Sequence, residues 1–178
     1  MTLETKRLIL RTLDMRDAKP VQELAGDFDI AKTTLHVPHP YPDGAAETWI
    51  ERVQTSAADG RGYTLAIIRR SDDVFMGAIS LGIAEAHRRA ELGYWIGKPY
   101  WGRGYTTEAA RRMIEFGLCE LNLHRIFALA MTKNPASSRV MQKIGMSYEG
   151  TLAHHALKWG EYEDLVVYGM VKSDGDGK

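Results

Sequence analysis

Hydrophobic and polar residues alternate in several short segments of the first half of the chain, and this period of two predicts β-strands. The first such segment, residues 6–13, alternates around Leu8 and Leu10. Further segments rich in β-branched and aromatic residues are 63–70, 74–85 and 90–96. The polar residues 71–73 separate two of these segments as a hairpin turn would. We therefore expect an antiparallel meander in this half of the protein.

Apolar residues three and four positions apart predict amphipathic helices at other places in the chain. These predicted helices are residues 17–26, 45–59, 107–121 and 135–144. In the second half, helices alternate with predicted strands at 125–131, 146–152 and 163–171. This order predicts an α/β fold with a mixed, mostly antiparallel central sheet, flanking helices and a crossover helix in the middle.

The composition is that of a single globular domain, with 178 residues of which 44% are hydrophobic and 26% charged. We expect this domain to span residues 1–172 and a flexible tail to follow at 173–178. The 23 basic and 23 acidic side chains give a formal net charge of zero. A nucleic-acid-binding protein usually carries an excess of positive charge, so no direct nucleic-acid partner is expected.

Cys119 is the single cysteine, which excludes an internal disulfide and a cysteine zinc site. The first ten residues lack the charged and then apolar layout of a signal peptide. No apolar run approaches the roughly 18 residues that span a bilayer. The sequence therefore predicts a cytoplasmic protein without a membrane partner and without a metal.

A glycine-containing loop lies between a predicted strand and a predicted helix, in the stretch "YWGRGYTTEA" at residues 100–109. Free amides at a helix N-terminus attract anions, and glycine lets a phosphate approach the backbone closely. A Walker loop is excluded because Tyr105 follows Gly104 where lysine is needed, and a Rossmann loop because Thr107 replaces its third glycine. On this stretch alone, a tight turn without any ligand stays an alternative.

A second cluster, "NPASSRVMQKIGM" at residues 134–146, has the features of a short capped helix. Asn134 suits the N-cap, Pro135 the first helical position and Gly145 the left-handed position after the helix. The stretch "ELGYWIGKPYWGRGYTTEA", followed at this spacing by the second cluster, resembles the acyl-CoA site of the GNAT acetyltransferases. The resemblance covers most of the chain and is strongest to the branch that acetylates the N-terminal alanine or serine of ribosomal proteins.

The resemblance implies which residues hold acetyl-CoA. The glycine loop and the start of its helix would bind the pyrophosphate, the end of the strand before it would line the pantetheine, and two residues of the second cluster would lie beside the cofactor. These residues are Gly102, Arg103, Gly104, Tyr105 and Thr106, then Trp95 and Ile96, then Asn134 and Arg139. Pro99 departs from the family pattern, which has glutamine or arginine at that position. Because the loop acts through backbone amides, this change should matter little.

Acetyl transfer to an amine needs a base for the amine and a proton for the departing thiolate. By the resemblance, Ser137 is the candidate general acid, although it would serve equally as a residue of the first helical turn. The general base is open, because Ala156 stands where related ribosomal-protein enzymes have a glutamate. Candidate bases are Glu91, Glu85, His154 and His155.

We therefore expect an N-acetyltransferase that moves acetyl from acetyl-CoA directly to an amine acceptor. The first expected acceptor is a protein N-terminus, and the second is a small amine such as a polyamine, an amino acid or an antibiotic. By similarity the acceptor would contact His36, Pro38 and Tyr41. A catalytically silent acyl-CoA-binding module is the alternative, and a homodimer stays open.

Overall fold

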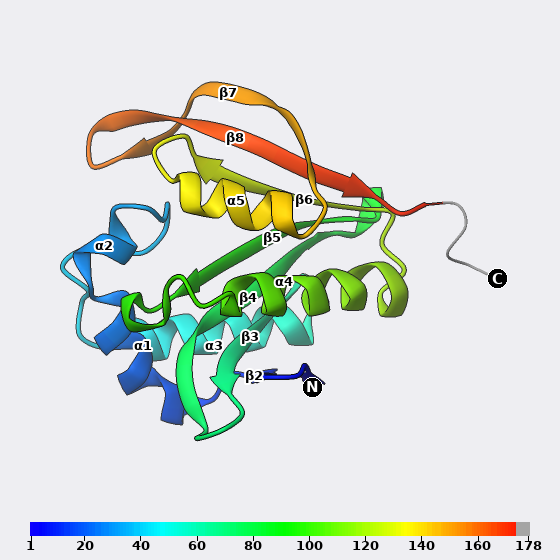
Figure 1. Ribbon diagram of the computed structural model, residues 1–178. Coiled ribbons are helices and arrows are strands. Elements are labelled where there is room, and N and C mark those ends of the chain that lie inside the picture. Colours follow the sequence, from blue (N-terminus) through cyan, green and yellow to red (C-terminus); the bar gives the residue numbers. More distant parts are fainter. Residues whose placement is uncertain (174–178) are drawn as a thin grey trace.

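The computed structural model describes residues 1–173 and shows one sheet flanked by helices (Figure 1). The strands are β1 (Thr2–Glu4), β2 (Leu8–Thr12), β3 (Gly62–Arg69), β4 (Val74–Ala84), β5 (Arg89–Ile96), β6 (Arg125–Met131), β7 (Ser147–Lys158) and β8 (Glu161–Val171). The α-helices are α1 (Ala18–Ala25), α2 (Phe28–Ala31), α3 (Ala45–Ala58), α4 (Tyr105–Glu115) and α5 (Pro135–Lys143). None of the helices in residues 1–173 is both long and apolar enough to cross a membrane.

The sheet has eight strands in the order β1-β2-β3-β4-β5-β6-β8-β7. Every neighbouring pair is antiparallel except β5 and β6, which are joined through the crossover helix α4. The antiparallel meander and the mixed α/β sheet expected from the sequence are therefore confirmed.

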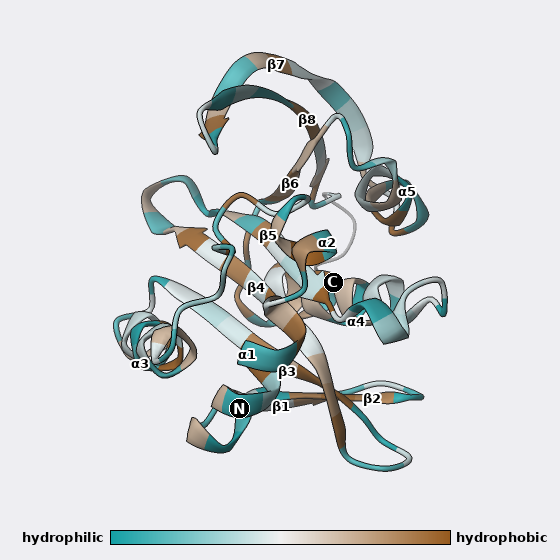
Figure 2. Ribbon diagram, turned by 90° about the vertical axis from the view of Figure 1, so that its left-hand side faces the viewer, coloured by the Kyte–Doolittle hydropathy of each residue, from teal (hydrophilic) through white to brown (hydrophobic). Residues whose placement is uncertain are grey.

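Side chains alternate between the two faces of the sheet, and each face carries its own helices. Leu65 and Ile67 of β3 belong to the buried cluster that includes Met113 of α4, whereas Ala66 and Ile68 belong to the cluster around Ile50 of α3. Figure 2 shows α3 and α4 on opposite sides of the sheet. The first face is called the α4 face below, and the second the α3 face.

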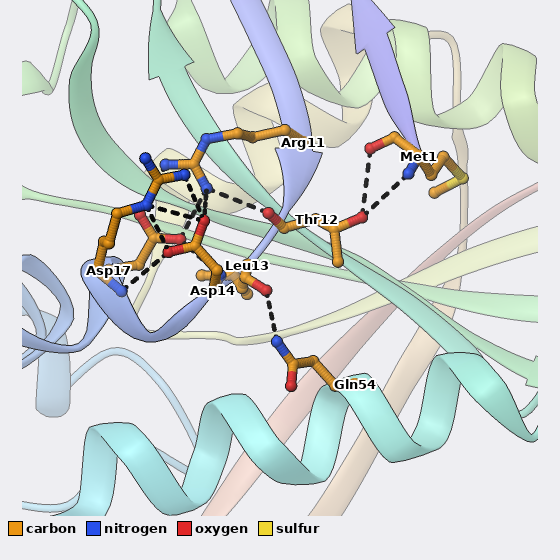
Figure 3. Close-up of polar contacts among 8 residues, drawn as sticks. Met1, Arg11, Thr12, Leu13, Asp14, Asp17 and Gln54 are labelled. Atoms are coloured by element: carbon orange, nitrogen blue, oxygen red, sulfur yellow. Dashed lines mark hydrogen bonds and ion pairs between the residues drawn. The ribbon is translucent and has the colours of Figure 1, made fainter.

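The corner between β2 and α1 is fastened by a buried ion pair (Figure 3). The Asp17 side chain is 3% exposed and accepts two hydrogen bonds of 2.8 Å from the Arg11 guanidinium. Asp17 also accepts from the backbone N–H of Asp14, and Gln54 of α3 donates to the Leu13 carbonyl at 2.8 Å. These bonds attach the helices of the α3 face to β2 and to the turn that follows it.

Several elements differ in extent from the sequence expectation. Helix α4 begins at Tyr105, two residues earlier than expected, and continues after Glu115 as a π-helical turn, Phe116–Glu120. Strand β7 is longer than expected, and both β1 and α2 were not expected at all. Gly145 has φ of +90°, which confirms its left-handed position after α5. Apart from Ser173, the expected tail lies outside the described residues.

Candidate active site

The site forms where β5 and β6 separate. Their pairing is limited to three positions, the last of which is Glu91 opposite Phe127. Beyond it, β5 continues beside β4 as far as Ile96, whereas β6 stays with β8 as far as Met131. A cleft of about 1170 Å³ lies here, and both strands line it. The sheet is thus split at its centre, and the cleft is lined by residues from both of its faces.

The glycine loop forms one end of this cleft. Gly102 and Gly104 line it with φ of +72° and +76°, a backbone conformation that side chains with a Cβ rarely adopt. Gly104 is the N-cap of α4, whose first intrahelical bond runs from the Glu108 amide to the Gly104 carbonyl at 3.1 Å. The amides before Glu108 are left for an external acceptor. The loop therefore has the backbone shape of an anion site.

Residues from the turn between β1 and β2 hold this loop from outside. The Arg7 guanidinium donates to the Arg103 carbonyl at 3.0 Å and to the Glu108 carboxylate at 2.6 Å, and it lies over the Tyr105 ring. Thr5 donates to the same carboxylate at 2.7 Å. Burial alone would raise the pKa of Glu108, but the hydrogen bonds from Thr5 and Arg7 outweigh it and leave the pKa lowered. Sequence reasoning gave Arg7 no role in the site.

Helix α5 forms the opposite wall. The Asn134 side chain caps it by accepting from the Ser137 amide at 3.3 Å, and its other atom donates to the Thr33 carbonyl at 3.4 Å. Arg139 and Lys143 line the cleft one and two turns further along this helix. These two cations line the same cleft as the uncapped N-terminus of α4, and together they suit a polyanionic ligand such as the phosphates of coenzyme A.

Tyr94 of β5 spans the cleft toward α5. Its hydroxyl lies 2.8 Å from the Ser137 hydroxyl and donates to the Ser137 carbonyl at 3.2 Å. Burial raises the pKa of Tyr94 to about 12, more than the Ser137 hydrogen bond lowers it, so the phenol stays protonated at neutral pH. No sequence pattern links Tyr94 with Ser137.

Successive residues of β5 point to opposite faces of the sheet. Tyr94 and Ile96 belong with the α4 face cluster, whereas Trp95 packs against Phe75 on the α3 face, with ring centroids 6.0 Å apart. By the same alternation Glu91 points to the α3 face. The glycine loop and the Tyr94–Ser137 pair therefore lie on one side of the split, and Glu91 lies on the other.

Glu91 is the ionisable residue at the point of separation. The residue is exposed to the open cleft, and desolvation by the surrounding protein raises the pKa of its carboxyl, while the nearby His36 and His155 oppose this rise. A carboxylate with a raised pKa takes up a proton more readily at neutral pH than an ordinary one. Of the four candidate bases, Glu91 alone lines the cleft within the described residues.

The other candidate residues fall into two groups. Those lining the cleft are Trp95, Ile96, Gly102, Gly104, Tyr105, Thr106, Asn134, Ser137, Arg139, His36, Pro38 and Tyr41. Outside its lining are Arg103, Glu85, His154 and His155. Glu85 lies in a turn after β4, and His154 stacks on Tyr162 with ring centroids 5.8 Å apart. His155 is exposed on β7 but near enough to Glu91 to affect its pKa.

The loop after α2 lines one end of the cleft and is held by the turn between β7 and β8. Lys158 is 6% exposed, and its ammonium donates to the Val37 carbonyl at 3.2 Å. Phe28 stacks on Trp159 with ring centroids 5.7 Å apart and meets His39 edge to face. This loop carries His36, Pro38 and Tyr41, so the predicted acceptor residues are attached to the far edge of the sheet.

Comparison with known proteins identifies the family. The model of a GNAT acetyltransferase domain matches residues 7–147. The chain belongs to the GNAT acetyltransferases. The uncharacterized N-acetyltransferase YoaA of Bacillus subtilis is 34% identical over 174 residues, 96% of each chain. The L-amino acid N-acetyltransferase AaaT of Escherichia coli is 28% identical over 170 residues, 93% of this chain and 98% of its own.

A solved structure shares the fold closely. RimL, a ribosomal L7/L12 α-N-protein acetyltransferase in complex with coenzyme A, superposes with a TM-score of 0.89 over 96% of this chain and 98% of its own, at 15% identity. At this identity the likeness shows the fold alone. The family makes this GNAT chain an acetyl-CoA-dependent N-acyltransferase, and its glycine cradle, cations and cleft volume fit that cosubstrate. Within residues 1–173 no group of three metal-binding side chains is found.

Proposed function

We propose that this GNAT enzyme transfers the acetyl group directly to an α-amine, with a protein N-terminus as the first candidate acceptor. The observation that carries the proposal is the position of Glu91, which faces the α3 side of the split while the glycine loop and Ser137 line its other side. Acetyl-CoA would enter on the α4 face and the amine on the α3 face. The reacting atoms then meet between β5 and β6.

A residue of the cleft is available for each of the two proton transfers. The neutral amine nitrogen attacks the thioester carbonyl, and its proton passes to the Glu91 carboxylate, directly or through a water molecule. As the carbon–sulfur bond breaks, the thiolate takes the proton of the Ser137 hydroxyl, and Ser137 regains a proton from water in the cleft, to which Glu91 releases the proton of the amine. Tyr94 lies within 2.8 Å of that hydroxyl and orients it. A thiol with a pKa of about 8.5 leaves readily, so this second proton transfer is the less demanding one.

The preference for an α-amine follows from the weak basicity of the proposed base, a carboxylate. A single carboxylate, even with a raised pKa, deprotonates a weakly basic ammonium far more easily than a strongly basic one. The α-amine of a peptide N-terminus, with a pKa of about 8, lies about 1 unit above neutral pH, whereas a lysine at about 10.4 lies over 3 units above it. At about 1.4 kcal/mol per unit, the cost is about 1.4 kcal/mol against about 4.6 kcal/mol.

Acetylation of peptide pairs tests this proposal. Each pair has the same sequence with a single internal lysine, and one member has a blocked N-terminus. We expect acetyl transfer from acetyl-CoA to the free N-terminus and at least tenfold less to the lysine of the blocked peptide. Equal labelling of both members would contradict the preference for α-amines.

A further inference from the structure

A second cavity of about 310 Å³ adjoins the acceptor end of the cleft on the α3 face. We call it the annex and define it by Arg52, Ser56, Arg61, Thr64, Ser80 and Gly82. Arg52, Thr64 and Ser80 also line the main cleft, so the two cavities are continuous. No role of the annex follows from acetyl-CoA binding or from the acetyl transfer described above.

The lining of the annex is cationic. Arg52 and Arg61 line it, and none of its lining residues within the described chain is acidic. Arg61 is neutralised by an ion pair with Asp59 at 2.6 Å. Arg52 makes no hydrogen bond and no ion pair with any residue of the part that the structure describes. The annex therefore offers one free guanidinium beside the hydroxyls of Ser56, Thr64 and Ser80.

The strand register places the annex close to the proposed base. Gly82 of β4 lies opposite Glu91 of β5, and Gly62 of β3 lies opposite Gly82. Neighbouring strands are about 4.8 Å apart, so the floor of the annex lies about 5 to 10 Å from the Glu91 backbone. At Gly82 this floor leaves open space, because the nearest atom to a Cβ there lies 4.0 Å away, and Arg52 lines the same cavity. The distance suits an amine and an anion that are separated by a few bonds.

We infer that the annex binds a carboxylate of the acceptor whose amine lies at Glu91. Arginine binds a carboxylate with two parallel hydrogen bonds, and the Thr64 hydroxyl can donate to the same group. The acceptor class is an α-amine with a carboxylate a few bonds away. A free amino acid and a peptide with an acidic first residue both have this chemistry. A polyamine would instead bring a second cation toward Arg52. This inference rests on the proposed α-amine transfer.

Two pairs of probes measure the effect of the carboxylate and distinguish its sources. The first pair is alanine and alaninamide, and the second is a tripeptide amide that begins with glutamate and its counterpart that begins with glutamine. The readout is the ratio of kcat/KM within each pair, because the ratio removes effects on cosubstrate binding and folding. A preference in the first pair indicates a free amino acid, and in the second an acidic N-terminus.

In Arg52→Gln we expect the ratio of the preferred pair to fall at least tenfold. Arg52→Lys retains the charge and should restore part of the ratio. Lys19→Gln is the matched control, because Lys19 is an exposed cation of α1 that lines neither cavity. We expect this control to keep the wild-type ratio.

Gly82→Val tests the same inference by filling part of the annex with a side chain. The nearest atom to a Cβ at Gly82 is the Glu91 carbonyl oxygen at 4.0 Å, so the strand accepts a side chain there without a clash. The valine would fill the floor of the annex and lower the ratio at least tenfold. Ratios within twofold of wild type in both Arg52→Gln and Gly82→Val would overturn the annex inference while leaving α-amine acetylation intact. Loss of the α-amine preference in the peptide pairs would instead contradict the proposed function.

Discussion

At the scale of single residues, Glu91 is the proposed general base. We predict that Glu91→Gln lowers kcat/KM about 10²-fold or more, the usual contribution of a general base. In the wild type the carboxylate must be ionised to accept a proton. Activity should therefore fall as the pH drops through the raised pKa of Glu91, which His36 and His155 moderate. A pH profile of both proteins measures this, and the acid limb should be missing in the variant.

A stability measurement separates this catalytic role from a structural one. A raised carboxyl pKa means that the fold disfavours the ionised form at neutral pH, so the neutral glutamine should leave the melting temperature unchanged or higher. Glu85→Gln is the matched control, because Glu85 lies outside the cleft lining. An active Glu91→Gln beside an inactive Glu85→Gln would refute the assignment.

At the scale of elements, we expect the connection between the glycine loop and α4 to determine cosubstrate affinity. We predict that Gly104→Asp binds acetyl-CoA at least roughly tenfold more weakly by calorimetry, where a tenfold change is about 1.4 kcal/mol. The variant places a Cβ at φ of +76°, 3.5 Å from the Arg7 guanidinium, and adds a negative charge to the loop that would bind the phosphates. Two unit charges about 4 Å apart at an effective dielectric constant near 20 repel by about 4 kcal/mol, before screening and before the nearby Arg7 guanidinium reduces it.

Gly60→Asp provides the matched control for backbone strain. Gly60 has φ of +69°, and no atom lies within 4 Å of its ideal Cβ. It follows α3 and does not line the cleft. Both variants should lose a similar amount of thermal stability, whereas Gly104→Asp alone should lose acetyl-CoA affinity. Equal affinities would mean that the loop does not hold the phosphates.

The sequence predicted those elements that are long enough to show a period. Helix α3 and strands β3 to β6 span at least seven residues each, and their apolar spacing is plain. Strand β1 has three residues and α2 has four, too few for any period to be recognised. The π-helical turn after α4 was missed because apolar residues continue there at helical spacing. The π-helical turn differs from an α-helix in its backbone hydrogen bonds, and the spacing of apolar residues does not reveal this difference.

The site was predictable in part, because the glycine loop and the cap of α5 are local in the chain. The contacts that complete it are not local. Arg7 and Glu108 are 101 positions apart, and Tyr94 and Ser137 are 43 apart. The sequence also did not indicate that Glu91 lies in the cleft and Glu85 does not. That difference depends on the position at which β6 separates from β5. Strand pairing of this kind depends on the whole sheet and cannot be read from a local segment of sequence.

At the scale of the whole molecule, surface carboxylates make the fold sensitive to acid. A hydrogen bond from Arg16 lowers the pKa of Asp14 to about 2, and bonds from Lys32 and Lys98 lower that of Asp29 to about 2. The unfolded chain has the ordinary value of about 3.9 for both. Their stabilising contribution is therefore present above about pH 4 and is lost as the pH falls toward 2.

We predict that Asp14→Asn/Asp29→Asn melts at a lower temperature than the parent at pH 7. The difference should shrink as the pH falls from about 4 to about 2, because the parent carboxylates become protonated in that interval. Thermal melts at a series of pH values measure it. Glu51→Gln, which changes an exposed carboxylate of α3, should follow the parent throughout. A constant difference down to pH 2 would contradict the ionic origin of the effect.

The separation of β5 from β6 also has a consequence for the order of events during turnover. Because the cosubstrate and the acceptor would reach the reacting centre from opposite faces of the sheet, neither has to leave before the other arrives. Both would be bound at the moment of transfer, and no acetylated form of the enzyme would accumulate. Initial-rate plots at several fixed acceptor concentrations should then give lines that intersect, whereas parallel lines would indicate that the acetyl group rests on the protein between the two substrates.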